Sequence, residues 1–223
     1  MYKDAQRLWE RIISLFDYSK VETVLKEELP KAEMKTALSL ILIAAVFGSL
    51  ISVLTLLETM QLVNFSYDMA SDLTVTQQPQ ITISELVPFI LFQFLFNAPF
   101  FVVFGLVYEA ISYGIIKTTG GRGTFTQQYH LSAIVMSALM LTSTLSFLLP
   151  LPCLQIFAFL GLLLLTLYFI FFVSVKAYGI VHDISFLHAL TIVVILTVPR
   201  FVLLVTLTNE AAMLFGLPQT AGV

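Results

Sequence analysis

Long apolar stretches dominate the chain and recur five times. Each is roughly 17 residues long or more, which is what an α-helix needs to cross a hydrocarbon core of about 30 Å. The pattern therefore predicts an all-α, polytopic integral membrane protein. The second stretch is long for one span, and we expect Pro99 to kink it or to split it into two pieces near Ala98. The predicted spans cover residues 37–57, 86–116, 131–149, 154–175 and 186–208.

A charged segment, residues 1–35, precedes the transmembrane region 36–208, and a short tail follows at 209–223. Within the first segment Leu8, Ile12 and Phe16 recur at helical spacing, while charged residues fall mostly on the other face. This pattern predicts an amphipathic helix. Two interpretations stay open, because the helix can lie on the membrane surface or pack under the transmembrane bundle as an ordinary solvated helix.

Basic residues flank the predicted spans on one side only. The N-terminal segment carries seven of the eleven, Lys117 and Arg122 lie between the second and third spans, and Lys176 lies between the fourth and fifth. The opposite loops have none. Because lysine and arginine are retained on the cytoplasmic side, we expect the N-terminus in the cytoplasm and the C-terminus outside.

The composition agrees with a lipid environment and excludes several classes of function. Of the 223 residues, 58% are hydrophobic and 11% are charged, against roughly 25% charged residues in a soluble domain. A net charge of −3 offers no basic surface for nucleic acid. The single cysteine, Cys153, cannot form an intrachain disulfide. No paired catalytic groups, His-Glu-x-x-His motif or phosphate-binding loop is present, so we expect no enzyme, metal or other cofactor.

A few ionisable residues lie within or beside the spans, where such groups often mark a functional site. Arg200 in the fifth span either reaches outward to an acidic residue such as Glu210 or lines a polar cavity. Glu109 lies inside the second span, and the histidines gather near the same end of the bundle. They are either ordinary interfacial residues or a cluster that titrates near neutrality and supports proton-linked movement. The candidate intramembrane polar site is Arg200, Glu109, His130, His188 and Lys176.

A glycine-rich loop joins the second and third spans on the predicted cytoplasmic side. Glycines tolerate left-handed backbone angles, so the simplest interpretation is a tight reversal between two helices. With basic residues alongside, its amides could also hold a lipid phosphate. The candidate headgroup or partner loop comprises Lys117, Gly120, Gly121, Arg122, Gly123 and Phe125.

Small residues recur at every fourth position in two of the spans. In lipid, helices associate through close packing of such residues, so these stripes predict helix–helix contacts or, as a second hypothesis, a homo-oligomer. The stripes are Ala44, Gly48 and Ser52 in the first span and Ala138, Thr142 and Ser146 in the third.

The run Gly120-Gly121-Arg122-Gly123 followed by Phe125, after a long second span, resembles the signature loop of the Yip1 domain family. The resemblance continues to His182-Asp183-Ile184-Ser185 and covers about residues 86–200. It implies a five-span, non-enzymatic membrane protein with a cytoplasmic N-terminus. Eukaryotic members lie in early secretory membranes and associate with small GTPases of the Rab type. This chain lacks their Asp-Leu-Tyr-Gly-Pro motif, which argues against a small GTPase partner and favours a prokaryotic plasma membrane over the ER or Golgi.

Two functional hypotheses follow. The first is a scaffold or adaptor in membrane organisation or trafficking, whose partners are the lipid bilayer, other membrane proteins or a second copy of the chain. The alternative is a small permease, channel or transporter subunit, motivated by Arg200, Glu109 and the expected kink at Pro99.

Overall fold

The described part of the chain is helical throughout, apart from its connections. A computed structural model describes residues 2–71, 83–148, 151 and 154–214, so most of the turn at 150–152, Cys153 and the tail beyond residue 214 lie outside it. The prediction of an all-α chain with five candidate spans is confirmed for these residues. Five helical runs are long and apolar enough to cross a membrane: Met34–Glu58, Val87–Thr118, Phe125–Ser146, Gln155–His182 and Phe186–Leu207.

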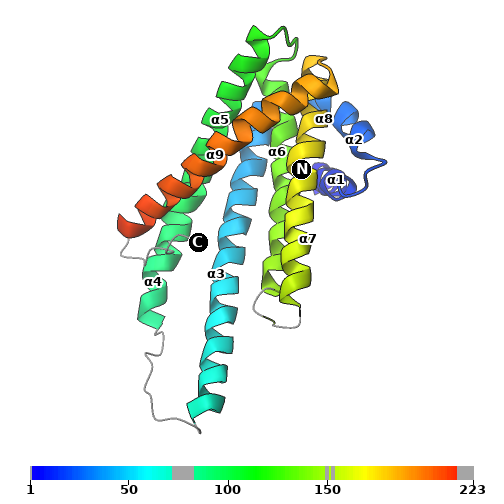
Figure 1. The fold of residues 1–223 in the computed structure, drawn as a ribbon. Coiled ribbons are helices and arrows are strands. Elements are labelled where there is room, and N and C mark those ends of the chain that lie inside the picture. The colour runs from blue at the N-terminus through cyan, green and yellow to red at the C-terminus, as the bar shows by residue number, and fades with distance from the viewer. Residues whose placement is uncertain (1, 72–82, 149–150, 152–153, 215–223) are drawn as a thin grey trace.

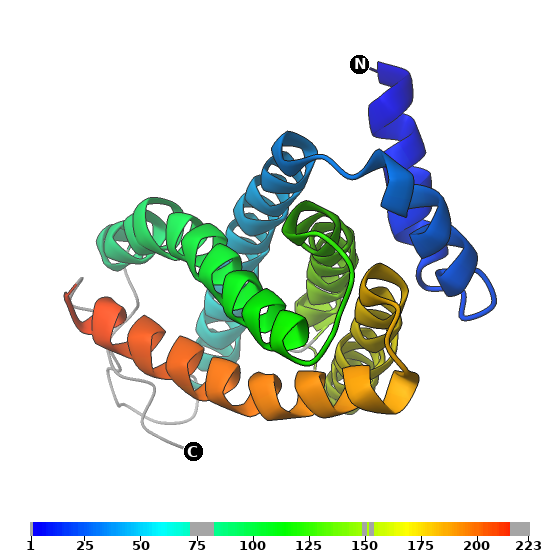
Figure 2. The same ribbon diagram turned by 90° about the horizontal axis from the view of Figure 1, so that it is seen from above.

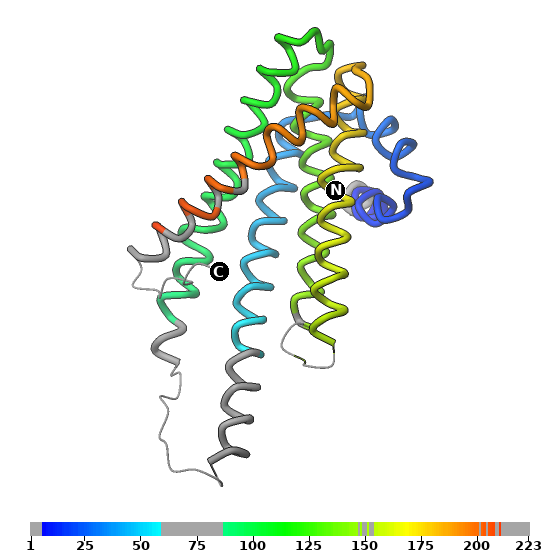
Figure 3. The backbone as a smooth tube through the Cα atoms, viewed as in Figure 1, coloured from blue at the N-terminus to red at the C-terminus, as the bar shows by residue number. Residues whose placement is uncertain are grey.

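The helices form one nearly parallel group and one inclined pair. Helices α3 (Met34–Ser71), α6 (Phe125–Thr142) and α7 (Gln155–Tyr168) stand side by side (Figure 1). Helices α5 (Ala98–Thr118) and α9 (Phe186–Leu214) lean away from this group, and α9 crosses α5 obliquely, as the backbone trace also shows (Figure 3). Seen from above, α9 runs along one flank of the bundle and the N-terminal helices lie on another (Figure 2).

Helices α3 and α6 pack together through the predicted small residues. Ala44 and Ala138 are buried, and a Cβ added to Gly48 would lie 3.2 Å from the Met140 Sδ atom. Farther along, the Thr55 and Ser146 hydroxyls are hydrogen-bonded at 3.0 Å. Helix α7, in contrast, leaves large apolar side chains exposed, which suits a surface that faces lipid; these are Ile156, Phe157, Phe159, Leu160, Leu163, Leu164 and Leu167.

The second span does not split at Ala98. Helix α4 (Ile83–Leu91) continues through a π-helical segment, η2 (Phe92–Asn97), into α5. The Ala98 amide donates to the Gln93 carbonyl, five residues earlier. Proline has no amide hydrogen, and its ring crowds the carbonyl four residues back. The wider π turn immediately before Pro99 relieves this crowding and keeps the helix continuous.

The third and fourth spans extend beyond their predicted limits toward the same end of the bundle. Helix α6 begins at Phe125, because Thr124 and Gln127 form a reciprocal capping box. The fourth run passes from α7 through a π-helical segment, η4 (Phe169–Val173), into α8 (Ser174–His182). The placement of Lys176 in a loop is therefore wrong, since it lies within α8. The polar residues of these extensions find partners inside the protein, as described below.

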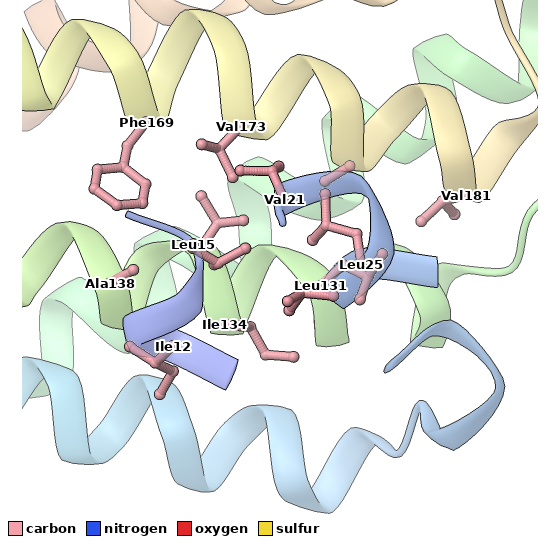
Figure 4. Close-up of a cluster of buried hydrophobic side chains, with 13 residues drawn as sticks. Ile12, Leu15, Val21, Leu25, Leu131, Ile134, Ala138, Phe169, Val173 and Val181 are labelled. Carbon is pink, nitrogen blue, oxygen red and sulfur yellow. The ribbon is translucent and has the colours of Figure 1, made fainter. Parts of the chain in front are cut away.

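The N-terminal segment forms a helical hairpin that packs on the bundle. It consists of α1 (Tyr2–Ser14), α2 (Val21–Glu28) and the short η1 (Leu29–Lys31). Leu15, Val21 and Leu25 are fully buried between α6 and the η4–α8 run (Figure 4). The Tyr168 hydroxyl donates to the Leu15 carbonyl at 3.0 Å. Ile12 of the predicted apolar face is buried against the bundle, whereas Phe16 is 39% exposed, so packing on the bundle is observed and a place at the membrane surface stays a prediction.

A buried carboxylate fastens the hairpin. The Glu28 side chain is only 1% exposed, and three basic side chains of the hairpin approach it: Lys31 Nζ at 3.0 Å, Arg7 Nη2 at 3.7 Å and Arg11 Nε at 3.8 Å. The His130 ring of α6 lies 4.0 Å away. A buried carboxylate is stable only when such partners replace its water. Glu28 therefore holds α1, α2 and η1 in one arrangement against α6.

Lys176 makes a second link, from α8 to the hairpin. Its Nζ lies 3.5 Å from the Glu22 carboxylate, 5.4 Å from the Tyr18 ring centroid and 5.0 Å from that of Phe172. The hydrogen bond and charge of Lys26, followed by the charge of Lys176, lower the pKa of the Glu22 carboxyl. Because the Glu22 side chain is exposed, the ion pair with Lys176 stabilises the hairpin less than the buried contacts of Glu28 do.

We expect Glu28→Gln to loosen the hairpin by about 1–3 kcal/mol, because the amide keeps the shape and loses the charge that its basic neighbours require. Hydrogen–deuterium exchange in detergent should then show faster exchange across Val21–Glu28 and unchanged exchange in α9. Glu10→Gln, which removes an exposed carboxylate from α1 of the same hairpin, is the control and should leave exchange close to wild type. Identical exchange in Glu28→Gln and the wild type would show that the carboxylate does not fasten the hairpin.

Candidate functional site

A cavity of about 220 Å³ lies between the spans, where α5, α6, the η4–α8 run and α9 meet. Its walls are mostly apolar, with Phe101, Met136 and Ile170 among them. Glu109 from α5 and Arg200 from α9 both line it, so the two most deeply placed ionisable residues predicted from the sequence face the same space. The other polar lining residues are Tyr108, Ser132, Ser174, Tyr178 and Thr197.

The Glu109 carboxylate is buried and held by two neighbouring helices. The Gln128 side-chain amide of α6 donates to Oε2 at 2.7 Å and to the Glu109 backbone carbonyl at 3.1 Å. The Tyr178 hydroxyl of α8 lies 3.2 Å from Oε1 and 3.1 Å from Oε2. These bonds fix the carboxylate in one orientation at the cavity wall.

The same network continues to the end of α8. The Nε2 atom of His182 lies 2.8 Å from the Gln128 Oε1 atom, and the His182 side chain is fully buried. Because the Gln128 amide nitrogen donates to Glu109, its oxygen is the acceptor for His182. The network thus assigns the hydrogen to Nε2 of the imidazole. Glu109, Gln128 and His182 form a continuous polar chain across α5, α6 and α8.

Arg200 is held by an aromatic ring and a sulfur atom. Its guanidinium carbon lies 4.2 Å from the centroid of the Tyr108 ring, and its Nη2 lies 4.0 Å from Met136 Sδ. Among the described residues no carboxylate lies within salt-bridge distance of it, Glu210 included. The cation–π contact orients the guanidinium, and Tyr108 and Met136, which hold it, both line the cavity.

The other three residues of the predicted polar site lie elsewhere. His130 faces Glu28 under the N-terminal hairpin, and Lys176 pairs with Glu22. His188 begins the first turn of α9, where its amide donates to the Ser185 hydroxyl at 3.3 Å. The predicted site therefore separates into a cavity with Glu109 and Arg200 and a hairpin contact with His130 and Lys176.

Three members of the network, Gln128, Tyr178 and His182, are not among the residues of the predicted polar site. Tyr178 and His182 are four residues apart, so they share one face of α8, and this spacing was a usable signal. Gln128 stands in a polar stretch that was assigned to the region before the third span. Nothing local in that stretch indicates that its side chain turns toward Glu109.

The glycine loop closes tightly over the end of α8. Gly120 has a φ of +97°, which favours glycine, and a Cβ at Gly123 would overlap the Val181 carbonyl oxygen. The Arg122 amide donates to the His182 carbonyl at 3.1 Å. Lys117 Nζ donates to the Gly121 carbonyl at 3.1 Å. The loop thus connects α5 to α6 and packs both against the end of α8.

The loop's backbone amides are largely used within the protein. Those of Gly120, Gly121 and Arg122 donate to the carbonyls of Lys117, Ile116 and His182. A phosphate nest needs free, converging amides, so this geometry favours the turn over the headgroup site. Phe125 points inward at its base, 5.6 Å from the Tyr113 ring centroid.

The chain matches no protein-family model, and no curated protein or solved structure is significantly similar to it. The resemblance to the Yip1 domain family stays a prediction from the loop and the topology.

We expect Gly123→Ala to destabilise the protein by about 1–3 kcal/mol, because its methyl group overlaps backbone that cannot move freely. Thermal unfolding in detergent, followed by fluorescence, measures the loss. Gly114→Ala is the matched control, since a Cβ there meets no atom within 4 Å and alanine favours the helix. A melting temperature for Gly123→Ala at or above that of Gly114→Ala would contradict the tight contact.

Proposed function

We propose that the protein is a small, non-enzymatic membrane transport protein, that is, a permease, channel or transporter subunit. The observation that carries this proposal is that Glu109 and Arg200, from different spans, line one cavity. A charged side chain deep in a bilayer costs roughly 2.5–3.5 kcal/mol on insertion scales, and such groups commonly mark solute or ion pathways. The hydrogen bonds of Glu109 to Gln128 and Tyr178, and the cation–π contact of Arg200 with Tyr108, make the two groups tolerable beside a mostly apolar cavity.

A second cavity supports a route through the bundle. It measures about 400 Å³ and is lined by residues of α3, η2, α5, α6 and α9 and of the 3-10 segment η3 (Ser143–Leu148). Phe101 and Met140 belong to the walls of both cavities. These two side chains thus stand between the two spaces, and their movement would connect them. The polar lining residues of the second cavity are Ser49, Ser52, Asn97 and Ser143.

The proposed orientation has the N-terminus in the cytoplasm and the C-terminus outside. The one-sided distribution of lysine and arginine supports it. In this orientation α2 and the glycine loop lie toward the cytoplasmic end, α1 lies beside the spans, and the polar chain from His182 to Glu109 lies between that end and the first cavity. The proposed location is a prokaryotic plasma membrane.

Osmotic reswelling of proteoliposomes tests transport with a panel of small solutes. We expect wild-type vesicles shocked with urea, acetate, ammonium or glycine to reswell faster than protein-free vesicles for at least one solute. Glu109→Gln and Arg200→Ala should each slow that reswelling by roughly 10- to 100-fold, the equivalent of one hydrogen bond to a charged group. Arg122→Ala, whose side chain is 83% exposed in the loop, is the control and should retain the rate. Reswelling indifferent to both cavity variants would overturn the proposal.

A second candidate is the scaffold or adaptor of the Yip1 type, with other membrane proteins, the bilayer or a second copy as partner. The observation that favours it is the outer face of the hairpin, where Trp9 is 50% and Ile13 is 49% exposed. Proximity labelling should identify reproducible neighbours that are lost in the double variant Trp9→Ala, Ile13→Ala. Phe157→Ala, which removes an exposed ring from α7, should keep them. A chain that is always solitary would argue against this role.

A further inference from the structure

An acidic and a basic side chain face the first cavity from two different helices. Glu109 and Arg200 both line it, yet no ion pair joins them among the described residues. Opposite charges that stay apart in a region of low dielectric are costly unless something bridges them. The arrangement therefore favours a ligand that satisfies both groups at once.

Each charge is oriented and has bonding capacity left. The Glu109 carboxylate has about four acceptor sites, and the side chains of Gln128, Tyr178 and Ser132 bond to it in the structure. Arg200 lies against the Tyr108 ring and offers N–H donors toward the cavity. One side of the cavity can thus take a cationic group and another an anionic one.

The remaining walls and the size limit the ligand further. Large apolar side chains, among them Met136, Phe169 and Val193, make up most of the lining. A volume of about 220 Å³ corresponds to roughly seven water molecules at about 30 Å³ each, which exceeds what a single inorganic ion needs. An apolar group of a few carbon atoms would occupy the space between these walls.

We infer that the cavity binds a small zwitterion with an apolar side chain, such as an apolar α-amino acid. Its carboxylate bonds to the Arg200 guanidinium, its ammonium group bonds to the Glu109 carboxylate, and its side chain packs on the apolar wall. This inference rests on the proposed transport function and names its class of substrate.

Calorimetric titration of the full chain in detergent tests the inference with three matched probes. L-leucine carries both charges, isocaproate lacks the ammonium group, and isoamylamine lacks the carboxylate. We expect leucine to bind at least about tenfold more tightly than either analogue, because each analogue leaves one buried charge unsatisfied.

Two conservative variants test which residue binds the ammonium group of the ligand and which binds its carboxylate. Glu109→Gln should abolish the preference for leucine over isocaproate, and Arg200→Gln should abolish the preference for leucine over isoamylamine. Arg122→Ala should change neither preference. Circular dichroism and melting temperature establish that each variant is folded before titration. A wild-type protein that binds isocaproate as tightly as leucine has an anion site, and that result overturns the inference, as does the absence of leucine binding.

The outcomes separate this inference from the function on which it rests. If reswelling with another solute depends on Glu109 and Arg200 while leucine does not bind, the substrate class is wrong and transport stands. If leucine binds with the expected preferences but no solute crosses the vesicles, the site is a receptor for zwitterions and the transport function is wrong.

Discussion

Gln128 joins three of the five spans through a single side-chain amide. Its nitrogen donates to Glu109 of α5, and its oxygen accepts from His182 of α8. In a hydrocarbon environment each unpaired polar group costs several kcal/mol, so an amide with partners on both sides is a specific and stable link between helices. The wall of the cavity, the position of Glu109 and the end of α8 all depend on it. The glycine loop supports the same region by covering the α8 terminus.

Helix α6 separates two polar environments with opposite faces. Gln128 points toward Glu109 and the cavity, whereas His130, two residues later, points toward Glu28 and the N-terminal hairpin. Residues two apart on a helix lie on different sides, so these groups cannot form one cluster. One side of α6 therefore faces the buried Glu109 carboxylate, to which Gln128 and Tyr178 donate. The other side faces the buried Glu28 carboxylate and its basic neighbours. The Glu109 side opens onto a cavity that Arg200 also lines.

Much of the fold was predictable because apolar length is a direct physical requirement for crossing a membrane. The start of the third span and the end of the fourth were not predictable. Gln128, Lys176 and Tyr178 are polar, and the sequence pattern therefore places them outside the membrane. Their partners are tertiary and distant in sequence, and hydropathy does not contain that information. The turn at the glycine loop followed from its composition, whereas the close approach of Gly123 to Val181 depends on a helix 58 residues away. Likewise, the depth of Glu109 and Arg200 was readable from sequence, but their meeting in one cavity depends on how α9 crosses α5.

The π-helical segment η4 has a consequence for which way α8 faces. The Ser174 amide and hydroxyl both turn back to the Phe169 carbonyl, five positions earlier. Such a segment accommodates one residue more than an α-helical turn, and at 3.6 residues per turn each extra residue rotates everything that follows by about 100°. Because of this rotation, one continuous helix presents an apolar face to the bilayer along α7. Along α8 it directs Tyr178 and His182 toward the interior of the bundle. If residues 169–173 tightened into an α-helical turn without the loss of a residue, the Tyr178 hydroxyl would rotate away from Glu109 and the His182 imidazole away from Gln128, although the composition of the chain stayed the same.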